Sequence, residues 1–314
     1  MNMIYTCTMN PAIDLFAEFD AFEPYIVNRS HFEDYQANGK AINISLMLKK
    51  MGIDSTATGF LGGFTGKFIE STLKNKGIQT AFVHVDGITR INTFIRAGEL
   101  EYKAVNHGPK ISKENQEKLL HLISGLGSQD TLFVSGSLPR NVDDSILIEI
   151  SRLSKLNGFS LVLDVSSKTL LKCLPYEPEL IKPSDEELAS FFDMDSNTAL
   201  SEEQIIAGAK KLLNLGAKHV IISRGAKGAI YLDPGNTLIV NAPKGKVVNT
   251  ACSGDTMLAT FIGSQIKGHT LTEALTFATA AASSTAFTAG LSDLQDVPLL
   301  VQHIHVQNKK ESEV

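Results

Sequence analysis

The alternation of short apolar runs with amphipathic helical segments is the feature that most limits what this chain can fold into. The runs Thr131–Val134, Ser160–Leu163 and His219–Ile222 are each apolar on consecutive positions rather than on every second one. Strands that are buried on both faces have this composition, and they belong to parallel sheets. Because helical segments separate the runs, we expect an α/β fold with a doubly wound, mostly parallel sheet flanked by helices.

Three serines mark the starts of expected helices: Ser112, Ser184 and Ser201. The last two are each followed three residues later by a Glu or a Gln. This spacing defines a capping box, in which the two side chains satisfy each other's backbone N–H groups. The helices are expected over residues 113–122, 185–192 and 202–213.

Two stretches, Asp14–Tyr35 and Thr89–Val105, interrupt this rhythm. Both are rich in β-prone residues of alternating polarity, and neither contains a helical segment. In the second stretch, Arg90–Arg96 and Glu101–Val105 are joined by a short connection that contains a glycine, which is typical of a hairpin. We therefore expect one domain, residues 1–314, in which two insertions form a small β-sheet lid on the main sheet.

The composition is that of a globular protein and excludes several other classes. Hydrophobic residues make up 43% and charged residues 20% of the 314 residues, which excludes a disordered or fibrous chain. The net charge of −5 leaves no basic surplus to neutralise a nucleic-acid backbone, so nucleic acid is not expected as a partner. The three cysteines have no C-x-x-C spacing, which argues against disulfides and a structural zinc site.

The apolar stretches do not predict contact with a membrane. The first basic residue is Arg29, whereas a secretory signal starts with basic residues. The longest uncharged stretch, Ala274–Ser292, is rich in Ala, Thr and Ser, so we expect a buried core helix there rather than a membrane span. The expected location is the cytoplasm.

The turn Thr250–Asp255 is the most informative stretch for function. It lies between an expected strand end at Val247–Val248 and an expected helix at Met257–Lys267. Backbone N–H groups at the start of that helix would point outward and, with the helix dipole, would bind an anion. These N–H groups belong to Cys252, Ser253 and Gly254.

Asp255 stands where a carboxylate can act on a hydroxyl beside that anion. Phosphoryl transfer needs positioning, charge stabilisation and one base, and an Asp in this place supplies the base. The alternative is that Asp255 only favours the start of the helix through its charge. The local pattern leaves both interpretations open.

A second candidate anion site is Gly39-Lys40, directly before an apolar helical segment at Ile42–Met51. A Lys at a helix start opposes the helix dipole, so an anionic partner is expected for Lys40. The alternative is an exposed Lys. Arg90 and Asn92 lie on the expected lid, where a single Arg is ordinarily solvated.

Two further stretches are candidates for holding a nucleotide and its metal. Glu187, in the acidic segment after Lys182, could hold Mg²⁺ near phosphates, although a capping box explains the same spacing. The turn Ser223–Gly228 follows a buried strand. Its glycines would let a nucleotide approach the backbone, and a hairpin turn explains them equally well.

Taken together, these stretches resemble the PfkB, or ribokinase-like, carbohydrate kinase family. The similarity runs over nearly the whole chain, and its motifs occur in the family's order. The resemblance implies a ribokinase-like α/β domain with a β-sheet lid, and ATP-dependent phosphorylation of a sugar hydroxyl. The motifs are Asn10–Asp14, Asn38–Asn43, Gly59–Gly63, Thr89–Asn92, Ser135–Pro139, Lys182–Leu188, Ser223–Gly228 and Thr250–Asp255.

The resemblance also implies a role for individual residues. Asp255 would be the catalytic base, and Cys252, Ser253 and Gly254 would form the anion hole. Glu187 would help to hold Mg²⁺, through water. The substrate-binding residues would be Asp14, Gly39, Lys40, Asn43, Arg90, Asn92 and Ser137. The nucleotide-binding residues would be Lys182, Ser184, Ser223, Gly225 and Gly228.

Asn10–Asp14 and Thr89–Asn92 are similar to kinases of phosphorylated ketohexoses. Lys40 and Arg90 agree with this, because a charged donor binds phosphate more strongly than a neutral one. We expect fructose 1-phosphate as the substrate, with tagatose 6-phosphate or fructose 6-phosphate as alternatives. A sugar-phosphate sensor without turnover is an alternative of another class, and a homodimer through the lid is an expected partner arrangement.

The chain departs from the family pattern at several site positions. Cys252 and Ser253 replace a Gly-Ala pair, Asn38 and Ala41 replace two glycines, and Ser184 replaces an Asn. A thiol at a helix N-terminus is expected to be partly ionised and reactive, so we expect alkylation of Cys252 to inactivate the protein. The alternative is a buried, inert thiol.

Overall fold

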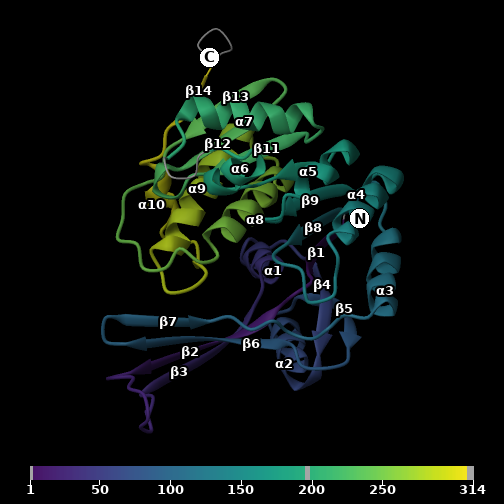
Figure 1. The fold of residues 1–314 in the computed structure, drawn as a ribbon. Helices are drawn as coiled ribbons and strands as arrows, with labels where there is room; N and C mark the ends of the chain where they lie inside the picture. Colours follow the sequence, from purple (N-terminus) through teal and green to yellow (C-terminus); the bar gives the residue numbers. More distant parts are fainter. Residues whose placement is uncertain (1–2, 195–198, 310–314) are drawn as a thin grey trace.

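The computed structural model describes residues 3–194 and 199–309. A ten-stranded sheet forms the body of the molecule, in the order β14-β13-β12-β11-β10-β9-β8-β1-β4-β5 (Figure 1). Strands β11 through β5 in this order are parallel, and β12, β13 and β14 are antiparallel. The bounds are β1 Ile4–Thr8, β4 Thr56–Gly62, β5 Gln79–Val85, β8 Thr131–Ser135, β9 Ser160–Asp164, β10 Leu180–Ile181, β11 His219–Ser223, β12 Ala229–Asp233, β13 Asn236–Val240 and β14 Val306–Asn308.

Helices cover both faces of this sheet, which confirms the doubly wound α/β fold. Strand residues alternate between two cores: Leu132 and Leu161 face one, whereas Phe133 faces the other. The first core is covered by α3, α4, α6 and α7, and the second by α1, α8 and α9. The helices are α1 Lys40–Lys50, α2 Gly63–Asn75, α3 Lys113–Ser124, α4 Ser145–Asn157, α5 Leu170–Cys173, α6 Asp185–Phe191, α7 Glu202–Asn214, α8 Ser253–Ile266, α9 Leu271–Ala286 and α10 Val297–Val301.

Helix starts follow the capping signals of the sequence. The Ser112 hydroxyl accepts a hydrogen bond from the third residue of α3, and Ser184 and Ser201 each complete a capping box. A further capping box at Thr270 opens α9, the expected core helix. None of the helices in the described ranges is long and apolar enough to cross a membrane.

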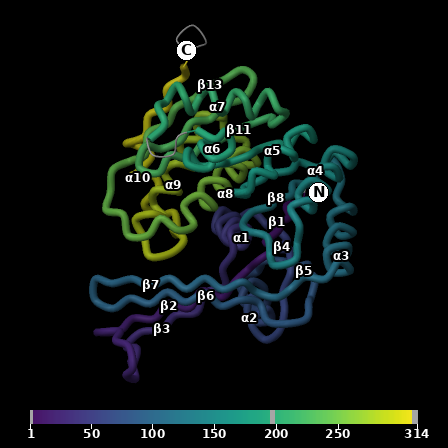
Figure 2. Tube along the Cα trace, in the orientation of Figure 1, coloured from purple at the N-terminus to yellow at the C-terminus, as the bar shows by residue number. Residues whose placement is uncertain are grey.

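The two stretches that interrupt the rhythm form a separate four-stranded sheet, the lid, in the order β3-β2-β6-β7. In Figure 2 its strands extend away from the body, below the ends of α8 and α9. On one face, Phe16 of β2 stacks on Phe94 of β6 with ring centroids 4.9 Å apart. The bounds are β2 Ala12–Phe19, β3 Phe32–Asn38, β6 Arg90–Ala97 and β7 Leu100–Ala104.

The expected strand end at Val247–Val248 is wrong. These residues belong to an irregular segment, and their side chains are 55% and 56% exposed. The backbone N–H groups of Val248 and Asn249 donate to the carbonyl of Ala286, at 2.8 and 3.1 Å. The segment is therefore held by the end of α9 rather than by a neighbouring strand.

Candidate active site

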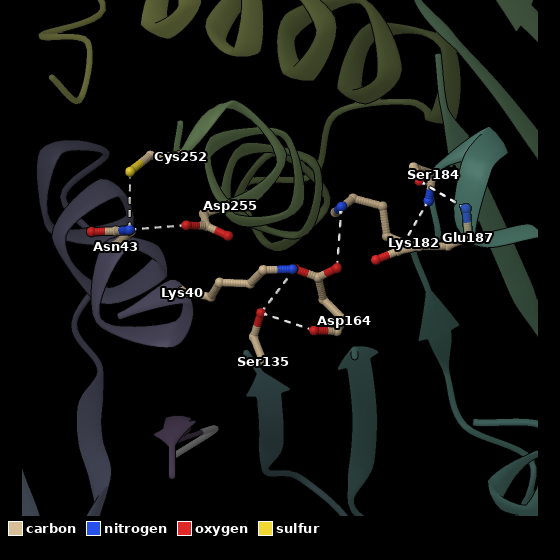
Figure 3. Close-up of polar contacts among 9 residues, drawn as sticks. All are labelled: Lys40, Asn43, Ser135, Asp164, Lys182, Ser184, Glu187, Cys252 and Asp255. Carbon is tan, nitrogen blue, oxygen red and sulfur yellow. Dashed lines mark hydrogen bonds and ion pairs between the residues drawn. The ribbon is translucent and has the colours of Figure 1, made fainter. Parts of the chain in front are cut away.

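The carboxyl ends of three neighbouring strands meet the N-terminal ends of two helices at one edge of the main sheet. Ser135, Asp164 and Lys182 come from the ends of β8, β9 and β10, and α1 and α8 begin opposite them (Figure 3). Ligands bind at this edge in open α/β sheets. The lid strand β2 begins close to this edge, since Asp14 of β2 is linked through Asn38 to Asn43 of α1.

The N-terminus of α8 offers unpaired donors. Within the described part of the chain, the N–H groups of Cys252 and Gly254 have no acceptor, and that of Ser253 makes only a 3.4 Å bond to Thr250. The Ser253 hydroxyl is buried and also has no partner there. Orphan N–H groups at a helix N-terminus form an anion-binding site. The start of α8 therefore fits the expected anion hole.

Asp255 lies in the first turn of α8 and is 4% exposed. Its Oδ2 accepts a 2.9 Å hydrogen bond from Nδ2 of Asn43, on α1. Burial and the nearby carboxylate of Asp164 raise the pKa of Asp255 to about 6, although Asn43 and two lysines act in the opposite direction. A carboxylate with a pKa close to neutral is suited to act as a general base.

Asp164 pairs with two lysines. Nζ of Lys182 lies 3.3 Å from its Oδ1, Nζ of Lys40 lies 3.4 Å from its Oδ2, and the Ser135 hydroxyl donates to Oδ2 at 2.9 Å. The anionic partner expected for Lys40 is therefore Asp164. Burial lowers the pKa of Lys40, but Asp164, Asp255 and Glu187 together raise it above its usual value. Ser135 and Asp164 directly follow the apolar runs 131–134 and 160–163, so the sequence placed them at the ligand-binding edge, but it gave neither residue a role.

A chain of hydrogen bonds joins the lid to Asp255. Asp14 accepts a 2.8 Å bond from Asn92 and a short bond from Asn38. Oδ1 of Asn38 in turn accepts a 2.9 Å bond from Asn43, which also donates to Asp255. Burial raises the pKa of Asp14, and the two amides lower it. These carboxylate and amide groups form a surface that can bind several hydroxyls.

Gly39 allows α1 to start against the end of β1. Its φ is +155°, and a Cβ at this position would lie 2.6 Å from Cγ2 of Thr8. The Thr8 hydroxyl accepts a 3.0 Å bond from the N–H of Ile42, in the first turn of α1. Only Gly fits this conformation and this close approach.

Arg90 and Ser137 meet at Asn10, which sequence reasoning did not assign. Nη2 of Arg90 donates to the Asn10 carbonyl at 2.9 Å, and Asn10 Nδ2 donates to the Ser137 hydroxyl at 3.3 Å. Nε of Arg90 is buried and has no partner among the described residues. Lys40 instead pairs with Asp164. The two side chains expected to bind the sugar phosphate, Arg90 and Lys40, therefore do not lie against the same groups.

The residues expected to bind nucleotide lie together. Ser184 and Ser223 form a parallel bridge just beyond β10 and β11. Gly225 has a φ of +52° with open space beside its Cα. At Gly228, however, a Cβ would lie 2.0 Å from the Val240 carbonyl, so the hairpin itself requires this glycine.

Glu187 completes the capping box of α6 by accepting a 2.9 Å bond from the Ser184 N–H. No group of three metal-ligating side chains occurs in residues 3–194 and 199–309. Mg²⁺ is often held by one or two carboxylates, by water and by substrate phosphates. Glu187 supplies one such carboxylate, and its charge helps to raise the pKa of Lys40 at the site, so Glu187 fits that kind of Mg²⁺ site.

A cavity of about 830 Å³ opens between the lid and the segment before α8. Asp14, Asn43 and Cys252 line its inner end, and the Phe16–Phe94 pair lines its lid side. This size and this mixture of apolar walls and few polar groups are typical of small-molecule sites. Asp255 is not among the residues that line this cavity, but it accepts a hydrogen bond from Asn43, which does line it.

The sequence pattern described as "pfkB family carbohydrate kinase" matches residues 3–297. The chain belongs to the PfkB family of carbohydrate kinases. A relative from Bacillus licheniformis, named D-tagatose-1-phosphate kinase, is 52% identical over 97% of this chain and 99% of its own. A Bacillus subtilis relative named 1-phosphofructokinase is 35% identical, with 97% and 99% covered. The structure of a putative phosphofructokinase from Staphylococcus aureus superposes with a TM-score of 0.89 at 35% identity, covering 98% and 99%.

For Cys252 in this PfkB-family site, the surroundings favour the alternative of a buried, inert thiol. Burial, together with the charges of Asp255 and Asp14, raises the pKa of the Cys252 thiol to about 12. The thiol is therefore protonated near neutral pH, despite its place at a helix N-terminus. Its sulfur lies 3.1 Å from Asn43 Nδ2, so it is part of the hydrogen-bonded surface rather than a free nucleophile.

Proposed function

We propose that this chain transfers the γ-phosphoryl group of ATP to the free C-6 hydroxyl of a ketohexose 1-phosphate, giving the 1,6-bisphosphate. The observation that carries the proposal is the position of Asp255. Asp255 is a buried carboxylate of raised pKa. Two lysines lie at the same edge of the sheet, as do the N–H groups at the start of α8, which are largely unpaired within the described residues. Phosphoryl transfer requires this combination of a base and charge stabilisation.

In the proposed reaction Asp255 accepts the proton of the acceptor hydroxyl. The N–H groups of residues 252–254, with Lys40 and Lys182, face the charge on the transferring group. Asp14, Asn43 and Asn92 hold the sugar hydroxyls beside Gly39, whose own N–H already donates to Oδ1 of Asn38. Mg²⁺, held by Glu187 through water, would neutralise charge on the nucleotide phosphates when bound.

The two charged ends of the substrates have separate candidate sites. The nucleotide would lie along Ser184, Ser223 and Gly225, at the ends of β10 and β11. The phosphate already on the sugar would lie at Arg90 and Ser137, where the buried Nε of Arg90 lacks a partner among the described residues. Arg is well suited to phosphate because it presents several fixed donors.

We propose D-tagatose 1-phosphate as the first candidate substrate and fructose 1-phosphate as the second. The 52% identical relative is named for the former and the 35% identical relative for the latter. Both sugars carry the phosphate on C-1 and offer the C-6 hydroxyl, and they differ only in configuration at C-4. The sequence motifs put fructose 1-phosphate first and did not include D-tagatose 1-phosphate among the alternatives.

A coupled ADP-release assay tests the function. We expect turnover with D-tagatose 1-phosphate or fructose 1-phosphate and at least tenfold lower kcat/KM with tagatose 6-phosphate and fructose 6-phosphate. Binding of a sugar phosphate without ADP release would show a sensor. Turnover with an unphosphorylated sugar alone would contradict the proposed substrate class.

We also propose that the protein is a cytoplasmic homodimer that pairs through the lid. Leu15, Tyr35, Ile95 and Tyr102 share the lid face opposite Phe16 and Phe94, because each is in register with a neighbour on that face. An apolar sheet face in water favours association with another surface. A second copy of the lid would cover it.

A further inference from the structure

Asp164 is a buried carboxylate at the edge of the sheet where the proposed reaction takes place, and the steps proposed for that reaction give it no role. It ends β9 and is 2% exposed, and its two oxygens contact Lys182 and Lys40 separately (Figure 3). Burial opposes its ionisation, but the two ammonium groups hold the pKa of Asp164 below its usual value. Asp164 is therefore a charged carboxylate in the interior, at the edge where the proposed reaction takes place.

We propose that Asp164 is a positioning residue for phosphoryl transfer, whose carboxylate holds the ammonium groups of Lys40 and Lys182 beside Asp255. The inference rests on the proposed kinase function. It assigns Asp164 no contact with either substrate. Its effect passes through the two lysines.

The position of Lys182 supports this role. Its side chain is 6% exposed, and a Cβ on Gly254 would lie 3.0 Å from its Nζ. The ammonium group therefore lies against the first turn of α8, next to the unpaired N–H groups. A buried ammonium beside a helix N-terminus is unfavourable without a nearby anion. Asp164 is that anion before a phosphate arrives.

The position of Lys40 completes the arrangement. Lys40 is the first residue of α1 and has no acidic residue in its own first turn. Its flexible side chain is 40% exposed and makes its ion pair across the site with Asp164. Held in this way, the ammonium also influences Asp255, since Lys40 lowers the pKa of that carboxyl.

Asp164 also acts on the base through its charge. The groups that face Asp255 are Asp164 from β9, Lys182 after β10, Lys40 and Asn43 from α1, and the Cys252 thiol, which shares Asn43 with it. Asp164 raises the pKa of Asp255, whereas the two lysines and Asn43 lower it. Loss of the Asp164 charge removes the raising influence and leaves both ammonium groups to act on Asp255.

The test compares D164N with S135A in the full chain. D164N keeps the shape of the side chain but removes its charge. We expect kcat to fall about 10- to 100-fold, the size of effect seen when partners that orient site residues are lost. The KM for the sugar phosphate should change by less than about threefold. The acidic limb of the kcat/KM profile should move to lower pH.

S135A is the matched control, because it removes the 2.9 Å hydrogen bond to Asp164 and leaves the charge. Its acidic limb should stay at the wild-type pH. Thermal unfolding of both variants checks that they are folded. A D164N enzyme with wild-type kcat, or one that loses activity equally at every pH, would overturn the inference. If the wild-type protein were inactive on every sugar phosphate, the proposed kinase function itself would be contradicted.

Discussion

At the scale of single residues, the environment of Asp255 sets both the chemistry and its pH range. The carboxylate is ionised above its pKa of about 6 and can then accept a proton. We expect kcat/KM to be constant at higher pH and to fall about tenfold per pH unit below about 6. A pH–rate profile with the preferred sugar phosphate measures this. A limb near pH 4 would show that Asp255 is not desolvated in the free enzyme.

The Asp255→Asn variant should lose activity but gain stability at pH 8. Loss of a general base lowers kcat about 10²- to 10⁴-fold. The folded-state pKa of Asp255 is raised above the unfolded value, so its ionisation costs stability as pH rises through about 6. The variant should therefore be more stable than wild type at pH 8, by about 1–3 kcal/mol. Urea unfolding at pH 8 and pH 4 checks the sign, since the gain should vanish at pH 4.

Cys252 should react slowly despite its position. With its pKa raised to about 12, little thiolate is present near neutral pH. We expect iodoacetamide at pH 7.5 to leave most of the activity intact over a period in which glutathione is fully alkylated. Rapid inactivation that MgATP prevents would contradict the buried, hydrogen-bonded thiol. C252S serves as the control for labelling at the two other cysteines.

At the scale of elements, local signals predicted helix starts better than strand ends. Ser112, Ser184 and Ser201 cap the expected helices because a cap is a contact between residues three apart. The apolar pair at Val247–Val248 was misassigned because its backbone is bonded to the end of α9, far away in sequence. The sequence placed Asp164 at the ligand-binding edge but did not predict its ion pairs, for the same reason. Its partners, Lys40 and Lys182, meet it only through the sheet order.

The capping boxes at Ser184 and Ser201 provide a matched pair for testing the stability of α6 and α7. Replacing an N-cap Ser by Ala costs about 1 kcal/mol. We expect Ser201→Ala to lose this stability with kcat unchanged, because among the described residues the Ser201 hydroxyl bonds only to the N–H of Gln204. Ser184→Ala should lose similar stability and also raise the KM for ATP, because the Ser184 hydroxyl accepts from the N–H of Glu187, which would hold Mg²⁺ at the nucleotide. Denaturant unfolding and ATP titrations measure both. Equal kinetic effects would contradict the assigned nucleotide side.

At the scale of the whole molecule, the sequence predicted the layers and the lid but not the sheet order. Alternation of apolar runs and helices fixes a two-sided parallel sheet, and the interruptions at Asp14–Tyr35 and Thr89–Val105 correspond to β2, β3, β6 and β7. Which strands lie side by side depends on contacts over the full chain. That order brings Ser135, Asp164 and Lys182 together, so the ion-pair centre of the site could not be derived from spacing.

The lid should control assembly. Tyr102→Asp places a charge on the exposed apolar lid face, so we expect a dimer in wild type and a monomer in the variant by sedimentation. Leu156→Asp, an exposed position on α4 away from the lid, is the control and should leave the assembly unchanged. If wild type sediments as a monomer, or both variants remain dimers, the lid is not the interface.

The most direct test of the central claim is a crystal structure with D-tagatose 1-phosphate and a non-hydrolysable ATP analogue. We expect the C-6 hydroxyl within hydrogen-bond distance of the Asp255 carboxylate. We also expect the terminal phosphate on the N–H groups of Cys252, Ser253 and Gly254, near Lys182. A terminal phosphate remote from α8, or a sugar hydroxyl turned away from Asp255, would contradict that claim.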